Sequence, residues 1–137
     1  MFQIDVMSRR PVYEQLVDQV ERYVLMGILK AEEQVPSVRS LSVSLAVNPN
    51  TIQKAYSELD HRGVVYSVPG RGCFVSVDAR KKIGERKMEN MGEFRRQVRE
   101  LALAGVDKKL VMDCVEDAYQ RGGADDDSGK ESDQDIR

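Results

Sequence analysis

The sequence has few of the residues that build metal sites and catalytic centres. Its 137 residues include two cysteines, Cys73 and Cys114, a single histidine, His61, and no tryptophan. One histidine and two distant cysteines cannot supply the ligand sets of the usual structural zinc sites, and they form no recognisable catalytic pair. No phosphate-binding glycine loop is present either. We therefore expect no metal, no cofactor and no enzymatic activity, and we interpret both cysteines as small buried apolar residues.

Long apolar segments are also absent. The longest apolar run is YVLMGIL, residues 23–29, which is far too short to span a bilayer. The N-terminal MFQIDVMSRRP lacks the apolar core of a signal peptide. We therefore expect a cytoplasmic protein with no membrane partner. The apolar fraction of 41% allows one modest core plus an appendage.

The excess of positive charge that is typical of nucleic-acid binders is missing too. The formal net charge is −2, but the charge is unevenly distributed. From residue 122 onward six acidic residues stand against two basic ones, so this segment carries −4 and the rest of the chain +2. Arg39, Lys54, Arg62 and Arg71 lie in the later part of residues 1–77. A locally positive face there would permit DNA binding without demonstrating it.

What the sequence does contain is a strong helix-start signal in LAVNPNTIQKAY, residues 45–56. Proline has no N–H and a fixed helical φ, so Pro49 suits the first helical position, and Asn48 before it suits the N-cap. Gly63 suits the residue after the helix end, and the spacing predicts a helix from about Pro49 to Arg62. The apolar face consists of Ile52, Ala55, Tyr56 and Leu59, and the outer face carries Asn50, Thr51, Gln53 and Lys54.

A second short helix is predicted directly before this one. Ser37 suits its N-cap, and Val38, Leu41 and Leu45 mark one apolar face. Only Ala46 and Val47 separate it from the cap of the next helix. Two short helices joined so tightly are typical of the helix-turn-helix, whose second helix enters the major groove of DNA.

The rest of residues 1–77 predicts a winged helix-turn-helix. An upstream helix opens at Pro11 and ends near Gly27, and residues 2–6 before it form a short edge strand or an ordered arm. Downstream, VVYSV and CFVSV flank the turn PGRG, which predicts a β-hairpin. Arg71 lies between two glycines at the tip of this hairpin, where an arginine can enter a minor groove.

Residues 35–76, VPSVRSLSVSLAVNPNTIQKAYSELDHRGVVYSVPGRGCFVS, resemble the DNA-binding domain of the GntR family of transcription regulators. The shared features are a proline, a small residue, any residue and an arginine at the second helix, then a threonine-containing recognition helix, a glycine and a G-x-G wing. IDVMSRRPVYEQL, residues 4–16, resembles the opening of the family. The resemblance implies a DNA-binding regulator with the winged fold.

The resemblance also implies which residues bind double-stranded DNA. Arg39 corresponds to an arginine that family members direct at DNA from the second helix. Pro49 stands where an arginine is common, so base preference would rest on Asn50 and Gln53, whose amides pair well with adenine. The predicted DNA-binding residues are Ser37, Arg39, Asn48, Asn50, Thr51, Gln53, Lys54, Tyr56, Gly70 and Arg71.

Residues 78–120 predict two amphipathic helices separated by Gly105. Their apolar faces are too wide for two helices to bury between them, so we expect a second copy of the chain to cover them. The alternative is that the helical pair folds back on the winged domain. The basic run Arg80–Lys82 is interpreted as a solvated linker, with contact to phosphates as the alternative. The predicted dimerisation residues are Met91, Phe94, Val98, Leu101, Leu110, Val111, Cys114, Val115 and Tyr119.

The short appendage resembles that of the YtrA-type branch of the family. This resemblance implies a homodimeric repressor of an operon such as a membrane-transport operon, a palindromic operator and an effector that the sequence does not identify. The expected fold class is α+β, mainly α: a winged helix-turn-helix over residues 1–77, a two-helix dimerisation domain over 78–120 and a disordered acidic tail over 121–137. The alternative function is a winged-helix protein-interaction module with little affinity for DNA.

Overall fold

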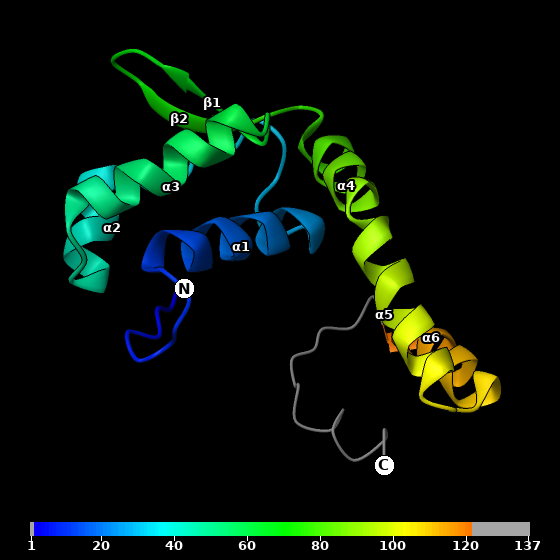
Figure 1. Cartoon of the computed structure of the whole chain (residues 1–137). Helices are drawn as coiled ribbons and strands as arrows, with labels where there is room; N and C mark the ends of the chain where they lie inside the picture. The colour runs from blue at the N-terminus through cyan, green and yellow to red at the C-terminus, as the bar shows by residue number, and fades with distance from the viewer. Residues whose placement is uncertain (1, 122–137) are drawn as a thin grey trace. The chain divides into compact units, whose positions relative to one another are not determined.

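The computed structural model describes residues 2–121 of the chain (Figure 1). These residues form the mainly helical α+β winged helix-turn-helix that the sequence predicts, followed by C-terminal helices. No helix in the described range is long and apolar enough to cross a membrane. The elements are α1 Val12–Leu25, α2 Val38–Leu45, α3 Pro49–His61, β1 Val65–Val68, β2 Gly72–Val75, α4 Ala79–Glu89, α5 Met91–Leu103 and α6 Lys108–Arg121.

The chain divides into two compact units with a boundary between Lys87 and Met88. The boundary expected after residue 77 is therefore too early. Ala79 and Ile83 are 2% and 1% exposed, so the first part of α4 belongs to the core of the winged unit. The interpretation of Arg80–Lys82 as a solvated linker is wrong, because these residues lie in the first turn of a packed helix. The predicted acidic tail lies outside the described residues, apart from Arg121 at the end of α6.

The core of the winged unit forms because α1 and α3 each bury one apolar face. Leu16 and Val20 of α1 and Ile52, Ala55 and Leu59 of α3 are all 0% exposed. Leu41 of α2 and the strand residues Val65 and Val75 complete the core. Burial of this face leaves the opposite face of α3 in solvent.

The two caps predicted from the sequence are present. The Ser37 side chain accepts a hydrogen bond from the backbone N–H of Ser40 at 3.0 Å, and the Asn48 side chain accepts one from the N–H of Asn50 at 2.7 Å. Between the helices, Ala46 adopts a left-handed conformation with φ 56°, which gives the tight turn. The predicted end of α3 at Arg62 differs by one residue, since α3 ends at His61 and Arg62 is its C-cap.

The wing is an antiparallel hairpin in which Val65 pairs with Val75 and Val68 with Gly72. Residues 32–35 run along the other edge of β2, where the N–H of Val35 donates to the Cys73 carbonyl at 2.9 Å. Gly72 is required at this point. Its φ is 122°, and a Cβ there would lie 2.5 Å from the Nε2 atom of Gln34.

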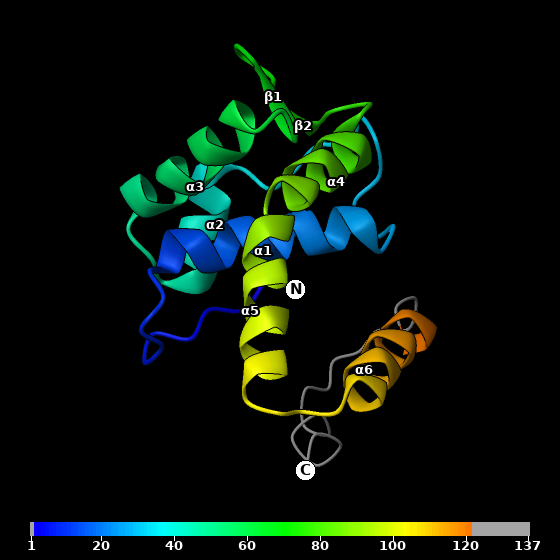
Figure 2. The same cartoon turned by 45° about the vertical axis from the view of Figure 1, so that its right-hand side comes forward.

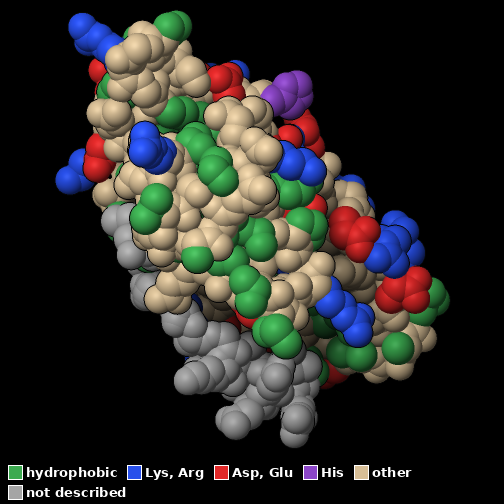
Figure 3. All heavy atoms as spheres, turned by 90° about the vertical axis from the view of Figure 1, so that its left-hand side faces the viewer, with side chains coloured by type: hydrophobic (Ala, Val, Ile, Leu, Met, Phe, Trp, Pro, Cys, Tyr) green, Lys and Arg blue, Asp and Glu red, His purple; other side chains and the backbone are tan. Residues whose placement is uncertain are grey.

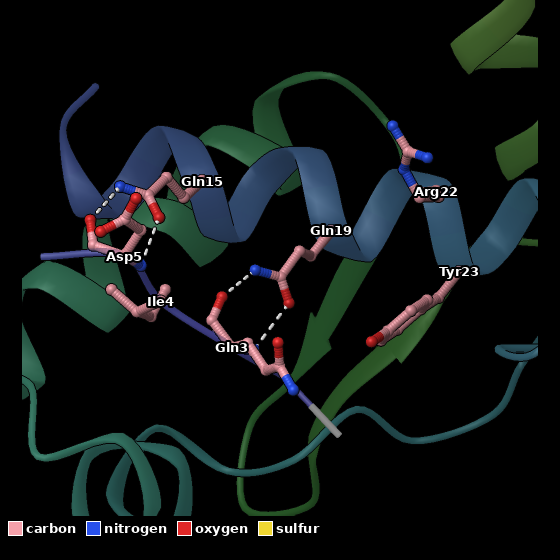
Figure 4. Close-up of a pocket in the computed structure, with 7 residues that line it drawn as sticks. All are labelled: Gln3, Ile4, Asp5, Gln15, Gln19, Arg22 and Tyr23. Atoms are coloured by element: carbon pink, nitrogen blue, oxygen red, sulfur yellow. Dashed lines mark hydrogen bonds between the residues drawn. The ribbon is translucent and has the colours of Figure 1, made fainter. Parts of the chain in front are cut away.

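The N-terminal arm, residues 2–7, is an ordered arm rather than a strand. Two glutamine side chains of α1 hold its backbone (Figure 4). Gln15 accepts from the N–H of Asp5 and donates to the Asp5 carbonyl at 2.9 and 3.0 Å, and Gln19 makes the same two bonds to Gln3. The amides thus supply the bonds that a neighbouring strand would make. They also line a pocket between the arm and α1, together with Ile4, Arg22 and Tyr23.

A buried ion pair joins α1 to the end of α3. Glu21 of α1 is 6% exposed, and its Oε2 atom accepts a hydrogen bond from Nη1 of Arg62 at 3.0 Å. The Nε atom of Arg62 also donates to Glu58 at 2.8 Å. This hydrogen bond lowers the pKa of Glu58 below its usual value.

Helices α5 and α6 form an open helical pair. They diverge from the turn at Gly105 that connects them (Figure 2), and neither helix contains a buried residue. Cys114 is exposed and Cys73 is half-buried, so the expectation that both cysteines are buried is wrong for the single chain. The large apolar side chains that are at least 41% exposed in the two helices are Met91, Phe94, Leu101, Leu103, Leu110, Met112 and Tyr119.

Replacement of Arg62 by methionine should lower the free energy of unfolding at pH 7 by about 2–3 kcal/mol. The variant keeps an apolar stem but leaves the buried Glu21 carboxylate without its partner, which costs about 3–5 kcal/mol where both charges are fully buried. Arg62 is 19% exposed, which reduces the cost. Urea unfolding measures the difference, with Arg22→Met at an exposed position of α1 as the control.

The same variant tests the charge of Glu58. A carboxyl group whose pKa is lowered in the folded state stabilises that state above its ordinary pKa, and this contribution is lost as the pH falls through the lowered value. The stability difference between the wild type and Arg62→Met should therefore shrink between pH 7 and about pH 3. A difference that stays constant over this range would contradict the contribution of Glu58.

Candidate DNA-binding surface

The recognition helix α3 presents a polar face to solvent. Asn50, Gln53 and Lys54 are exposed and Thr51 is half-buried, as expected for the side of a helix opposite Ile52 and Leu59. The amides and the hydroxyl can bond to base edges, and the ammonium group to phosphate. The side-chain oxygen of Asn48 is occupied by the N-cap, which leaves its NH₂ group as a donor at the start of the helix.

Two of these side chains are already oriented by neighbours. The Nζ atom of Lys54 lies 4.1 Å from the centre of the Tyr13 ring of α1, a cation–π contact that holds the ammonium group beside the start of α1. The Nε2 atom of Gln53 is 3.3 Å from the hydroxyl of Ser57, one turn further along α3. Tyr13 was not among the predicted site residues, because its contact with Lys54 crosses between helices and leaves no local signal in the sequence.

Tyr56 is a correction to the predicted set. It is 5% exposed, and its hydroxyl donates to the carbonyl of Pro36 at 2.6 Å. Burial raises the pKa of Tyr56, so the hydroxyl remains protonated as a donor. Tyr56 therefore lies in the core and fastens α3 to the residue before α2, rather than facing DNA.

Helix α2 contributes one exposed cation. Ser37 uses its hydroxyl as the N-cap, which fixes the first turn, and Arg39 lies exposed in that turn. The connection between α2 and α3 is short and the two helices contact each other, so Arg39 is carried on a helix that packs against the recognition helix. A guanidinium group in this position can make two parallel hydrogen bonds to guanine or to phosphate.

The wing tip has a fixed backbone and a free side chain. Gly70 has a φ of 79°. The N–H of Arg71 donates to the Val68 carbonyl at 2.9 Å, and the Arg71 carbonyl accepts from Nε2 of Gln34 at 2.9 Å. The Arg71 side chain remains exposed. Gln34 is a supporting residue that sequence reasoning missed, because it lies 37 residues from the turn that it holds.

The surface over these elements carries separate cations rather than a continuous basic patch. Figure 3 views the side on which α2, the start of α3 and the wing tip lie in Figure 1, and the Lys and Arg side chains there lie apart from one another, some beside acidic side chains and others among uncharged groups. Such a surface favours hydrogen-bonding readout with a small number of phosphate contacts.

A tight helix-turn-helix followed by a β-hairpin wing defines a winged helix-turn-helix protein. The sequence model of the bacterial regulatory proteins of the gntR family matches residues 12–75. The HTH-type transcriptional repressor YtrA of Bacillus subtilis (strain 168) is 36% identical over 129 residues, which cover 90% of this chain and 97% of that protein. The chain therefore belongs to the GntR family of DNA-binding transcriptional regulators, and so to a class of regulators rather than enzymes.

Solved structures agree with this assignment over most of the chain. A transcriptional regulator from Oenococcus oeni has a TM-score of 0.68 at 31% identity and covers 85% of this chain and 97% of its own. YtrA from Sulfolobus acidocaldarius, a GntR-family transcription factor, has a TM-score of 0.59 at 31% identity over 71% of this chain and 97% of its own. The likeness extends beyond the winged unit into the C-terminal helices.

Replacement of Tyr56 by phenylalanine should separate a core role from a DNA contact. Loss of the bond to Pro36 should lower the free energy of unfolding by about 1–1.5 kcal/mol, because a partly buried carbonyl loses its donor. DNA affinity should be unchanged at temperatures where the variant stays folded. Thermal unfolding and DNA titration measure the two effects, and a loss of affinity as large as that of Arg39→Ala would restore Tyr56 to the DNA-binding set.

Proposed function

We propose that this protein is a homodimeric, sequence-specific repressor that binds a palindromic operator. The observation that carries the proposal is the arrangement of the winged unit. Burial of Ile52 and Leu59 turns the amides of Asn50 and Gln53 outward on the recognition helix, and the wing tip offers the exposed Arg71 on a fixed turn. A groove-reading helix and a wing arginine are the parts that a winged helix-turn-helix uses on duplex DNA.

The chemistry of α3 favours adenine within each half-site. Pro49 offers no donor at the first position of the helix, so the reading groups in the first turns are the side chains of Asn50, Thr51 and Gln53. Carboxamides make two hydrogen bonds to the N6 and N7 atoms of adenine in the major groove. Contacts to guanine would then come from Arg39 or Arg71.

The homodimer is proposed because the second unit exposes its own apolar faces. Phe94 and Leu101 of α5 are 47% and 41% exposed, and Leu110 of α6 is 45% exposed, although all three lie on the apolar faces predicted from the sequence. An apolar face of this extent marks an interaction surface. A two-fold dimer would cover it and would present two recognition helices to two inverted half-sites.

Repression follows from the likeness to YtrA of Bacillus subtilis, which is described as a transcriptional repressor. The resemblance to the YtrA-type branch extends the proposal to an operon for membrane transport. A dimer bound over a promoter would repress by excluding other proteins from the same DNA.

Fluorescence anisotropy on the protein's own promoter fragment and on a shuffled duplex tests the DNA-binding proposal. The wild type should bind the promoter fragment and not the shuffled duplex. Its affinity should fall steeply with salt because phosphate contacts release counterions. Arg39→Ala should weaken binding about tenfold or more, the loss of one good base or phosphate contact. Arg22→Ala removes the same charge from an exposed position of α1 and should have little effect.

Two outcomes of that titration would contradict the proposal. Equal and weak binding to both duplexes, with no response to Arg39→Ala, would favour the alternative of a protein-interaction module. If Arg39→Ala and Arg22→Ala lose the same affinity for the promoter duplex, the protein is attracted to DNA by its overall charge and not through a defined contact surface.

Phe94→Asp and Leu110→Asp should convert the dimer into a monomer, because each places a carboxylate in the proposed apolar interface. Gln97→Asp introduces the same charge at an exposed polar position of α5 and should leave the dimer intact. Sedimentation velocity measures the mass, and circular dichroism shows that the winged unit remains folded. A Phe94→Asp protein that stays dimeric, or a wild type that is monomeric, would reject the proposed interface.

A further inference from the structure

The basic run at the start of α4 has no role in the proposed DNA-binding surface, and its contacts point to a different one. Arg80 reaches back to the end of α1. Its Nη1 atom donates to the carbonyl oxygens of Leu25 at 2.8 Å and Val24 at 3.2 Å, which lie 55 and 56 residues earlier in the chain. The Nη1 atom of Arg80 is therefore engaged with the protein, although the residue is exposed.

These carbonyls are a favourable place for a guanidinium group. The last carbonyls of a helix have no intrahelical donor, and the partial negative charge of the helix dipole is concentrated on them. α1 ends at Leu25. The Val24 carbonyl already accepts from the N–H of Gly27 at 3.1 Å. Arg80 therefore supplies the donor for the Leu25 carbonyl, a second donor for Val24 and a positive charge at that end. A lysine would supply the charge without the planar, multiply bonding group.

Two further contacts fasten the same turn of α4. Ala79 and Ile83 are 2% and 1% exposed and belong to the core of the winged unit. The stem of Lys82 lies over Gly63, where a Cβ atom would be 3.4 Å from its side chain. The first turn of α4 is thus attached to the end of α1, to the turn after α3 and to the core between them.

The remainder of α4 contains no buried residue, and its link to the winged unit is electrostatic: besides the hydrogen bond that Glu58 of α3 accepts, the charge of Arg86 contributes to the lowered pKa of this carboxyl group. Residues 84–89 are all exposed, and the second unit begins within this stretch, at Met88. The direction in which the chain leaves the winged unit is therefore set at the first turn of α4. Arg80 is the residue there that ties α4 to a helix of the DNA-binding unit through hydrogen bonds.

We infer that Arg80 is a positioning residue that fixes the direction of α4 and thereby sets the half-site spacing that the dimer accepts. The inference rests on the proposed function. In a dimer joined through its second units, each recognition unit is carried on its own α4. Each added base pair moves a half-site by about 3.4 Å and turns it by about a tenth of a turn, so rigidly held units match one spacing only.

Loosening this attachment has a definite consequence for binding. Once one winged unit of a rigid dimer has bound its half-site, the other unit has a high effective concentration at the second half-site if the spacing fits. If the spacing does not fit, that effective concentration is very low. If Arg80 is removed, the affinity for the duplex with the correct spacing should fall. The loss of affinity caused by a changed spacing should then become smaller. A phosphate contact would instead affect every duplex alike.

The test uses the full-length dimer and the promoter duplex whose half-sites are located by footprinting. Wild type, Arg80→Ala, Arg80→Lys and Lys81→Ala are titrated on this duplex, on versions with one or two base pairs added between the half-sites, and on a single half-site. Lys81 is exposed and adjacent, so its variant removes the same charge without the contact to α1. Thermal unfolding and sedimentation show that each variant is folded and dimeric, and Arg80→Lys serves if Arg80→Ala does not fold.

The wild type should lose about tenfold or more in affinity for each altered spacing. Arg80→Ala should bind the original duplex several-fold more weakly, should discriminate less between spacings, and should bind the single half-site like the wild type. A uniform loss on all duplexes, or an unchanged spacing profile, would overturn the inference. Failure of the wild type itself to prefer the promoter duplex would reject the proposed function, which is a distinguishable result.

Discussion

The amphipathic division of α3 is the constraint on which the rest of the structure depends. Ile52, Ala55 and Leu59 are completely buried against the remainder of the winged unit. A helix has one rotational position that buries such a face, so the outward direction of Asn50 and Gln53 follows from the core. The Asn48 cap and Pro49 then fix where the helix begins, and so which residues occupy its first turn.

Polar contacts between distant segments hold α3 and the wing turn, which carry the proposed DNA-binding surface, in place. Tyr56 fastens α3 to Pro36 before α2, Arg62 fastens the end of α3 to Glu21 of α1, and Gln34 fastens the wing turn at Arg71. Each of these bonds satisfies a buried or turn-forming polar group, and each would cost more to break than it contributes in isolation. The supporting residues are consequently as important to the geometry of the surface as the side chains that face solvent.

The helix-turn-helix could be predicted from the sequence because its signals are local. Ser37 and Asn48 cap helices within three residues of themselves, and Pro49 marks a helix start regardless of tertiary context. The hairpin was likewise signalled by its turn. The exposure of Asn50, Gln53 and Lys54 was predicted from their place opposite the apolar stripe of α3, and the structure confirms that they are exposed.

What could not be predicted depends on contacts across the chain. α4 was missed because its amphipathic pattern is weak, with only Ala79 and Ile83 buried, and because the contact of Arg80 with α1 spans more than fifty residues. Tyr56 was assigned to DNA although it lies on the apolar face of α3, since the acceptor of its hydroxyl, Pro36, lies 20 residues away. The apolar faces of α5 and α6 were predicted, but neither helix has a buried residue in the single chain.

Selection of duplexes from a random-sequence pool by the full-length protein tests the central claim most directly. The account predicts an enriched inverted repeat, with adenine at positions read by Asn50 and Gln53, bound by two chains per duplex. Failure to enrich any motif, or enrichment of a single unrepeated site bound by one chain, would contradict a dimeric reader of a palindromic operator.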